Sequence, residues 1–220
     1  MKGETKNMCV IVTKEMNRKM PSKETLKKCF LANPDGCGFM YNYDNHVYIE
    51  KGFMFFDEFY SRICELDSQI NLKKCAIVFH FRISTSGKID EGNCHPYPIC
   101  DDIKFMRSTF LQCKDVAYCH NGVIRDYAPK DKLMNDTQMF GMHVLNKFYK
   151  INHEFYRDKD IMKMISLLCK SKLCFLNSNG EIFYVGNFFT YKGNQFSNLY
   201  FANFKKRYYF FDDLYEMGRV

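Results

Sequence analysis

The stretch 75–81, Cys-Ala-Ile-Val-Phe-His-Phe, most strongly constrains the fold of this 220-residue chain, because it is a nearly unbroken apolar run. Such runs are typical of strands that are buried on both faces. Other short runs rich in β-branched and aromatic residues are separated by turn residues. They alternate with segments of helical periodicity. The sequence therefore predicts one domain of the α+β class.

Local signals place the individual elements. The predicted helices are one that begins at Ser22 and ends at the turn 33–36, one at 55–70, one capped by Asp136 that runs to about Lys150, and one from Asp158 to about Cys169. The predicted strands are 8–13, 38–43, 46–49, 75–81, 116–119, 173–176 and 182–185, with further strands after residue 188. Asp44-Asn45 and the turn 177–180 each predict a hairpin, and 84–98 is predicted to be a loop.

Composition narrows the class of protein. No apolar run is long enough to span a membrane, and residues 1–7 are too polar for a signal peptide. The eleven cysteines are scattered without regular spacing, which favours reduced thiols in a cytoplasmic protein. The net charge of +7 comes from short basic groups and not from one long block, so a solvated surface is favoured over nucleic-acid binding.

Cys9 stands at the head of the strand predicted at 8–13. Taken alone, it is an ordinary buried strand residue. If the chain is cut between Met8 and Cys9, however, one residue carries both a thiol and a free α-amine. An α-amine titrates near ~7.7–8.0, so it can accept the thiol proton at neutral pH. The position of Cys9 therefore predicts a candidate nucleophile that has its own base.

Three later segments carry polar groups at the ends of predicted elements. Arg82 ends an apolar strand and needs an anion, either in a structural salt bridge or in a bound carboxylate. Asn121 and Gly122 follow a strand, where they form either a tight turn or two N–H donors that converge on one oxygen. Asp136 is either a helix cap or a carboxylate that binds a cation.

In this order, the four segments resemble the glutaminase domain of class II glutamine amidotransferases, which are N-terminal-nucleophile hydrolases. The turn 33–38 is similar to the Asn-Pro-Asp-Gly-x-Gly turn of that family, and 93–96 to its Asn-x-His-Pro loop. Both are interpreted as structural loops that border the site. The resemblance covers residues 9 to about 138, and more loosely 173–201, and is strongest to short stand-alone proteins of phages and bacteria.

The resemblance implies a four-layer αββα sandwich and a role for each residue. Cys9 would attack the side-chain amide of glutamine, release ammonia and form a γ-glutamyl thioester, which water or an acceptor resolves. Arg82 would bind the substrate carboxylate and Asp136 the α-ammonium, while Asn121 and Gly122 would form the oxyanion hole. No cofactor and no metal is implied. The implied partners are glutamine or a related γ-amide and a protein that accepts the ammonia.

The sequence departs from the family at two points. Residues 1–8 precede Cys9, so either Met8 is the true start or 1–8 is a propeptide, and 9–220 is expected to form one glutaminase-like domain. The second departure is in the loop after Arg82. Ile83 stands where the family commonly has an aromatic residue, and Ser86 stands where the synthase enzymes of the family often have a histidine.

Two alternatives belong to other classes. The first is a non-catalytic binding protein on the same fold, with an unprocessed N-terminus. The second is a zinc-binding module, although the chain has no CxxC pair. Its candidate ligands are Cys94, His95, Cys100, Cys113, Cys119 and His120.

Overall fold

Every strand pairing in the computed structural model, which describes residues 8–203, is antiparallel. The strands form two sheets. The larger sheet has the order β10 (Phe189–Tyr191), β11 (Asn194–Phe196), β1 (Val10–Lys14), β4 (Ile77–Phe81), β2 (Cys37–Tyr43), β3 (His46–Phe53) and β6 (Phe110–Cys113). The smaller sheet has the order β5 (Tyr97–Pro98), β7 (Val116–Asn121), β8 (Lys172–Asn177) and β9 (Ile182–Val185). The α+β prediction is confirmed.

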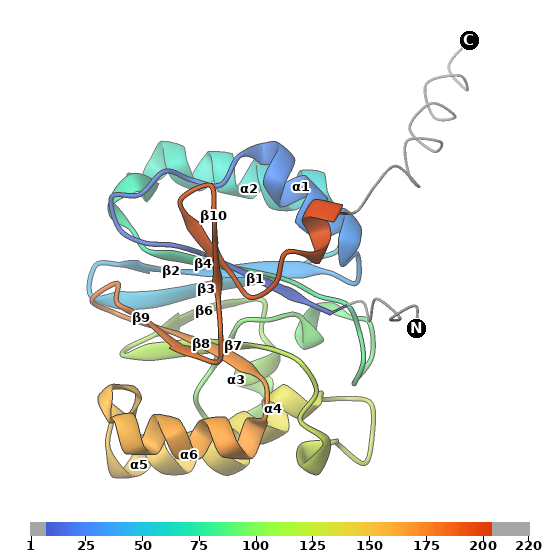
Figure 1. Ribbon diagram of the computed structural model, residues 1–220, viewed down its shortest axis with the longest axis vertical. Coiled ribbons are helices and arrows are strands. Elements are labelled where there is room, and N and C mark those ends of the chain that lie inside the picture. The colour runs from blue at the N-terminus through green and yellow to red at the C-terminus, as the bar shows by residue number, and fades with distance from the viewer. Residues whose placement is uncertain (1–7, 204–220) are drawn as a thin grey trace.

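Helices lie on the outer sides of the two sheets (Figure 1). Next to the larger sheet are α1 (Lys23–Ala32) and α2 (Phe56–Gln69), and below the smaller sheet are α5 (Asn146–Ile151) and α6 (Lys159–Cys169). The remaining short helices are α3 (Ile103–Arg107) and α4 (Asp136–Phe140), and a π-helical turn, Gly141–Leu145, joins α4 to α5.

Three apolar clusters hold these layers together. The alternation of side chains along a strand sends neighbouring residues to opposite faces of a sheet. Ile11 of β1 and Cys119 of β7 therefore belong to the cluster between the sheets. Val10 faces the cluster around α1 and α2, and Tyr118 faces the cluster that includes residues of α4 and α6. Polar side chains on the faces between the sheets must consequently find partners inside the protein.

Most of the predicted elements are present. Ser22 and Asp158 cap α1 and α6, and the hairpin between β2 and β3 turns through Asp44 and Asn45, which both have positive φ. The predicted cap at Asp136 is wrong: the cap of α4 is Asn135. Its Oδ1 accepts a hydrogen bond from Gln138 N at 3.0 Å, and Gln138 Oε1 accepts one from Asn135 N at 2.9 Å.

The strand predicted at 116–119 runs two residues further, through Asn121, because His120 and Asn121 both pair with β8. The sequence also did not predict the short elements α3 and β6. Residues 1–7 and 204–220 lie outside the described residues, so the predicted leader 1–8 is described only at Met8, and the end of the predicted domain 9–220 is not described.

Candidate active site

A narrow cavity of about 20 Å³ collects four of the five predicted site residues, because Cys9, Arg82, Gly122 and Asp136 all line it. Asn121 is not among its lining residues. Larger pockets of about 540 and 590 Å³ lie elsewhere and contain none of the five residues. Four chain segments that are far apart in the sequence therefore meet at one point.

Cys9 directly precedes β1 and is only 8% exposed. Its Sγ donates to Ile83 O and accepts from Ile83 N, each at 3.3 Å. Burial raises the pKa of the thiol to about 11, although the hydrogen bond from Ile83 and the charge of Arg82 act in the opposite direction. The thiol is therefore protonated at neutral pH, and it needs a base before it can act as a nucleophile.

Arg82 is a buried cation without an ionic partner among residues 8–203. Its side chain donates to Ser84 Oγ at 3.0 Å and to Ser86 O at 2.8 Å, both from Nη2. Its Nη1 is buried and has no hydrogen-bond partner in the described structure. A guanidinium that keeps donors free inside a protein is suited to bind an anion.

Asp136 is the first residue of α4 and is 4% exposed. Its Oδ2 accepts from Ile124 N at 2.6 Å, and its Oδ1 accepts from Thr137 N at 2.9 Å. Burial raises the pKa of this carboxyl, while the two backbone hydrogen bonds lower it. No cationic side chain among the described residues pairs with it. A bound cation would relieve this unfavourable burial.

Asn121 is the last residue of β7, and Gly122 follows it. Gly122 has φ +145°, and a Cβ atom at this position would lie 2.6 Å from Ser171 Cβ, so only glycine fits without rearrangement. The side-chain Nδ2 of Asn121 donates to Ser197 Oγ at 2.8 Å, and its Oδ1 is buried without a partner among residues 8–203. Asn121 is therefore held through Ser197.

Three buried histidines that the sequence did not assign to the site lie at or next to the cavity: His95 and His120 line it, and His80 contacts both. His80 and His95 stack with ring centroids 4.0 Å apart, and His80 Nε2 donates to His120 O at 2.9 Å. Burial lowers the pKa of His80 and of His120 to about 3, and it lowers the pKa of His95 well below the usual value. All three rings are therefore neutral at physiological pH.

His95 and His120 line the cavity directly. Both ring nitrogens of His95 are buried without a partner in the described structure, whereas His120 contacts Thr137 Oγ1 at 2.8 Å and Ser171 Oγ at 2.6 Å. The motif at 93–96 was the signal that could have identified His95 as a lining residue.

The turn 33–36 positions the backbone of Arg82. Asp35 N donates to Arg82 O at 3.0 Å, and Arg82 N donates to Gly36 O at 2.9 Å. The carboxylate of Asp35 also accepts from Ser84 N at 2.7 Å. The interpretation of this turn as a loop that borders the site agrees with these contacts.

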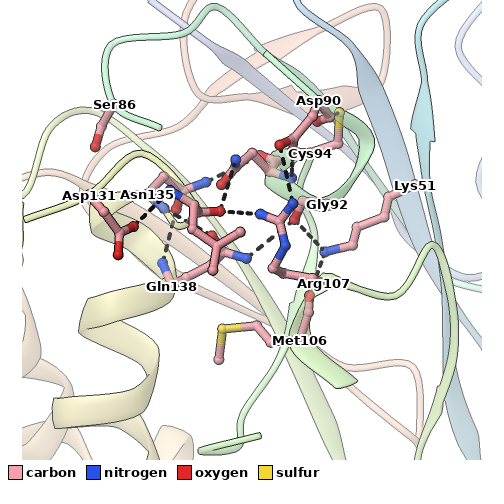
Figure 2. A network of polar contacts seen from close by, with 12 residues as sticks. Lys51, Ser86, Asp90, Gly92, Cys94, Met106, Arg107, Asp131, Asn135 and Gln138 are labelled. Carbon is pink, nitrogen blue, oxygen red and sulfur yellow. Dashed lines mark hydrogen bonds and ion pairs between the residues drawn. The ribbon is translucent and has the colours of Figure 1, made fainter. Parts of the chain in front are cut away.

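The loop that contains the motif 93–96 is tied to the start of α4 (Figure 2). Asn135 Nδ2 donates to Asn93 O at 3.2 Å, and Gln138 Nε2 donates to Gly92 O at 3.2 Å. In the same network, Arg107 pairs with Asp90 at 3.1 Å. These contacts fix the position of α4, and therefore of Asp136, relative to His95.

No protein-family model matches this chain, and no curated protein matches it. Among residues 8–203, no three His, Cys, Asp or Glu side chains gather in a way that could hold a metal ion. In the same range, no helix has the length and apolar character needed to cross a membrane. The eleven cysteines are all free thiols.

Proposed function

We propose that this protein is an amidohydrolase of the class II glutamine amidotransferase type, with Cys9 as its nucleophile once Met8 is no longer attached. One observation carries the proposal. A buried guanidinium and a buried carboxylate, each without an ionic partner among the described residues, line the same cavity as a buried thiol. A free amino acid with an amide side chain presents the complementary charges and an electrophilic carbon.

Each group has a defined part in this reaction. The α-amine of Cys9 takes the thiol proton, and the sulfur attacks the amide carbon to form a C–S bond. The resulting oxyanion is stabilised by N–H donors from Asn121 and Gly122. The C–N bond then breaks, the amine returns its proton to the leaving nitrogen, and ammonia departs. Water cleaves the thioester to give glutamate and the free thiol.

The raised pKa of Cys9 supports the requirement for processing. While Met8 is attached, no α-amine is available at Cys9, and burial keeps the thiol protonated. The full chain is therefore expected to bind an amino acid without cleaving it. Binding without cleavage is also what the second candidate function, a non-catalytic binding protein, predicts. The residues that precede Cys9 favour this second function.

The cavity must widen to accept glutamine, because about 20 Å³ is room for roughly one water molecule. Ile83, Thr85 and Ser86 form one wall, and they belong to the loop that follows β4. We expect this loop to move outward when glutamine enters and to close over it afterwards.

The layering of two antiparallel sheets between helices supports the finer assignment to a four-layer αββα sandwich of the N-terminal-nucleophile type (Figure 1). The position of Cys9 ahead of a central strand also fits that assignment. On this proposal, the released ammonia passes to a separate acceptor protein.

The experiment uses the folded chain, cleaved so that Cys9 becomes the first residue. Incubation with glutamine should release ammonia, and the Cys9→Ala variant should release none. A glutamine analogue with a diazoketone in place of the amide should alkylate the Cys9 sulfur with loss of N₂, so the protein should gain the mass of the analogue less that of N₂. N-acetylglutamine tests the site for the ammonium group, because it keeps the carboxylate and the amide but has no positive charge.

The outcomes separate the two candidate functions. Ammonia release that depends on Cys9 and is much weaker with N-acetylglutamine supports the amidohydrolase. Glutamine binding without ammonia release or covalent labelling supports the binding protein. The absence of both binding and release contradicts the assignment of Arg82 and Asp136 to a substrate site.

A further inference from the structure

Ser197 connects the strand of the candidate nucleophile to the candidate oxyanion residue. It directly follows β11 and is fully buried. Its Oγ accepts from Ile11 N at 2.9 Å and lies 2.8 Å from Asn121 Nδ2. The backbone N of Ser197 also donates to Ile11 O at 2.9 Å. One hydroxyl therefore touches both β1 and the end of β7.

Two hydrogen-bonding groups at this contact have no partner within residues 8–203. A serine hydroxyl has one donor and two acceptor sites. When Asn121 Nδ2 and Ile11 N both donate to Oγ, the hydroxyl hydrogen has no acceptor among the contacts of the described residues. The Oδ1 atom of Asn121 is at the same time buried, and no residue in the described part of the chain is its partner. A buried polar group without a partner costs about 1–3 kcal/mol.

One change gives the Ser197 hydroxyl hydrogen and Asn121 Oδ1 a partner each, while Nδ2 gives up its bond to Ser197. Rotation of the Asn121 amide by half a turn exchanges Oδ1 and Nδ2. Ser197 Oγ then accepts from Ile11 N and donates its own hydrogen to Asn121 Oδ1. The Nδ2 group occupies the place of the unpartnered oxygen, and its two N–H bonds become available to another acceptor. The Ile11 N–H takes one lone pair of Oγ in both arrangements.

We propose that Ser197 is a positioning residue that orients the Asn121 amide, so that Nδ2 faces away from Ser197 and can donate to the oxyanion of the reaction. This inference rests on the proposed function, but the orientation of the amide can be measured without any activity. The role belongs to the hydroxyl of Ser197, because the methyl group of alanine could neither accept from Ile11 nor donate to Asn121.

The first test is NMR spectroscopy of the full chain labelled with ¹⁵N-asparagine, in which the Asn121→Asp variant identifies the side-chain signal. We expect weak or absent nuclear Overhauser effects from the Asn121 amide protons to the β protons of Ser197 and to the amide proton of Ile11. Strong effects to both would place Nδ2 against Ser197 and overturn the proposal.

The second test is kinetic and uses the folded chain after cleavage ahead of Cys9. Ser197→Ala should lower kcat for glutamine about 10- to 100-fold, which is less than the loss expected when a complete oxyanion donor is removed. The KM should change by less than about twofold, because Arg82 and Asp136 are untouched. Ser197→Thr keeps the hydroxyl and should recover most of the lost kcat.

Thr13→Val is the matched control. It removes a hydrogen bond of the same strand, from Thr13 Oγ1 to Tyr184 Oη at 2.8 Å, away from the cavity. It should destabilise the protein without lowering kcat. If Ser197→Ala and Thr13→Val behave alike while the wild type releases ammonia, the positioning role is wrong and the proposed function stands. If the wild type releases none, the proposed function fails and the NMR result alone decides the orientation.

Discussion

Arg82 and Asp136 line one cavity with opposite charges, yet no ion pair between them occurs among residues 8–203. Ser86 lies between them: its carbonyl accepts from Arg82 at 2.8 Å, and its Oγ accepts from Asp136 N at 3.3 Å. Two opposite charges that are kept apart can bind a ligand that is itself a zwitterion. This relationship gives the first prediction.

Replacement of Arg82 by methionine should change the free energy of unfolding by no more than about 1 kcal/mol. The loss of its hydrogen bonds to Ser84 and Ser86 is offset by the removal of a buried charge that has no ionic partner among the described residues. The substitution should still abolish measurable glutamine binding. Urea denaturation and calorimetric titration measure the two effects.

Arg62→Met is the contrasting variant. Arg62 donates to both carboxylate oxygens of Glu50, at 2.6 and 2.9 Å, and the Glu50 side chain is only 7% exposed. Loss of this partner should cost about 2–4 kcal/mol. Equal destabilisation by the two substitutions would mean that Arg82 has a structural role.

The second prediction concerns the reactivity of Cys9 in the full chain. Because burial raises the pKa of its thiol to about 11, alkylation by iodoacetamide should still be accelerating above about pH 9. Mass spectrometry of the peptide that contains Cys9 gives the rate at each pH. A rate that levels off near neutral pH would show that the thiolate is stabilised even while Met8 is attached.

The third prediction follows from the neutral histidines. The pKa values of His80 and His120 are lowered to about 3, so the unfolded chain binds protons between about pH 6.5 and 3 that the folded protein does not. The free energy of unfolding should therefore decrease as the pH falls through this range, by up to about 1.4 kcal/mol per unit for each group. Urea denaturation at several pH values should give a smaller slope for His120→Gln than for the wild type.

The fourth prediction concerns Lys51, which is buried against the Tyr97 ring at 4.1 Å and donates to Met106 O at 2.7 Å (Figure 2). Burial lowers its pKa to about 7. Between about pH 7 and 10.5 the unfolded chain binds a proton that the folded protein lacks, so stability should rise with pH across this range. Lys51→Met should remove that rise, while the same change at the exposed Lys73 should leave it intact.

Local chemistry explains which parts of the fold were predictable. The caps Ser22 and Asp158 and the turn at Asp44-Asn45 follow from contacts within a few residues. The error at Asp136 is also local, because the pair Asn135 and Gln138 has the spacing of a capping box and competes with Asp136 for the cap. Short elements such as β6 contain too few residues to show a hydrophobic periodicity.

Some features of the site were likewise predictable from local motifs, and others were not. The motifs indicated Cys9, Arg82, Gly122 and Asp136, and the structure brings these four to one cavity. The absence of an ionic partner for Arg82 depends on contacts with distant segments, which no local pattern records. The stacking of His80 on His95 and the hydroxyl bridge from Ser197 to Asn121 likewise join elements that only the tertiary fold brings together.

The position of β1 between β4 and β11 has a consequence for biosynthesis. Asn198 donates to Cys9 O at 2.7 Å across a separation of 189 residues. A ribosome makes Cys9 before it makes β11 and Asn198, because synthesis runs from the N-terminus. The surroundings of Cys9 are therefore completed only after residue 198 has been synthesised.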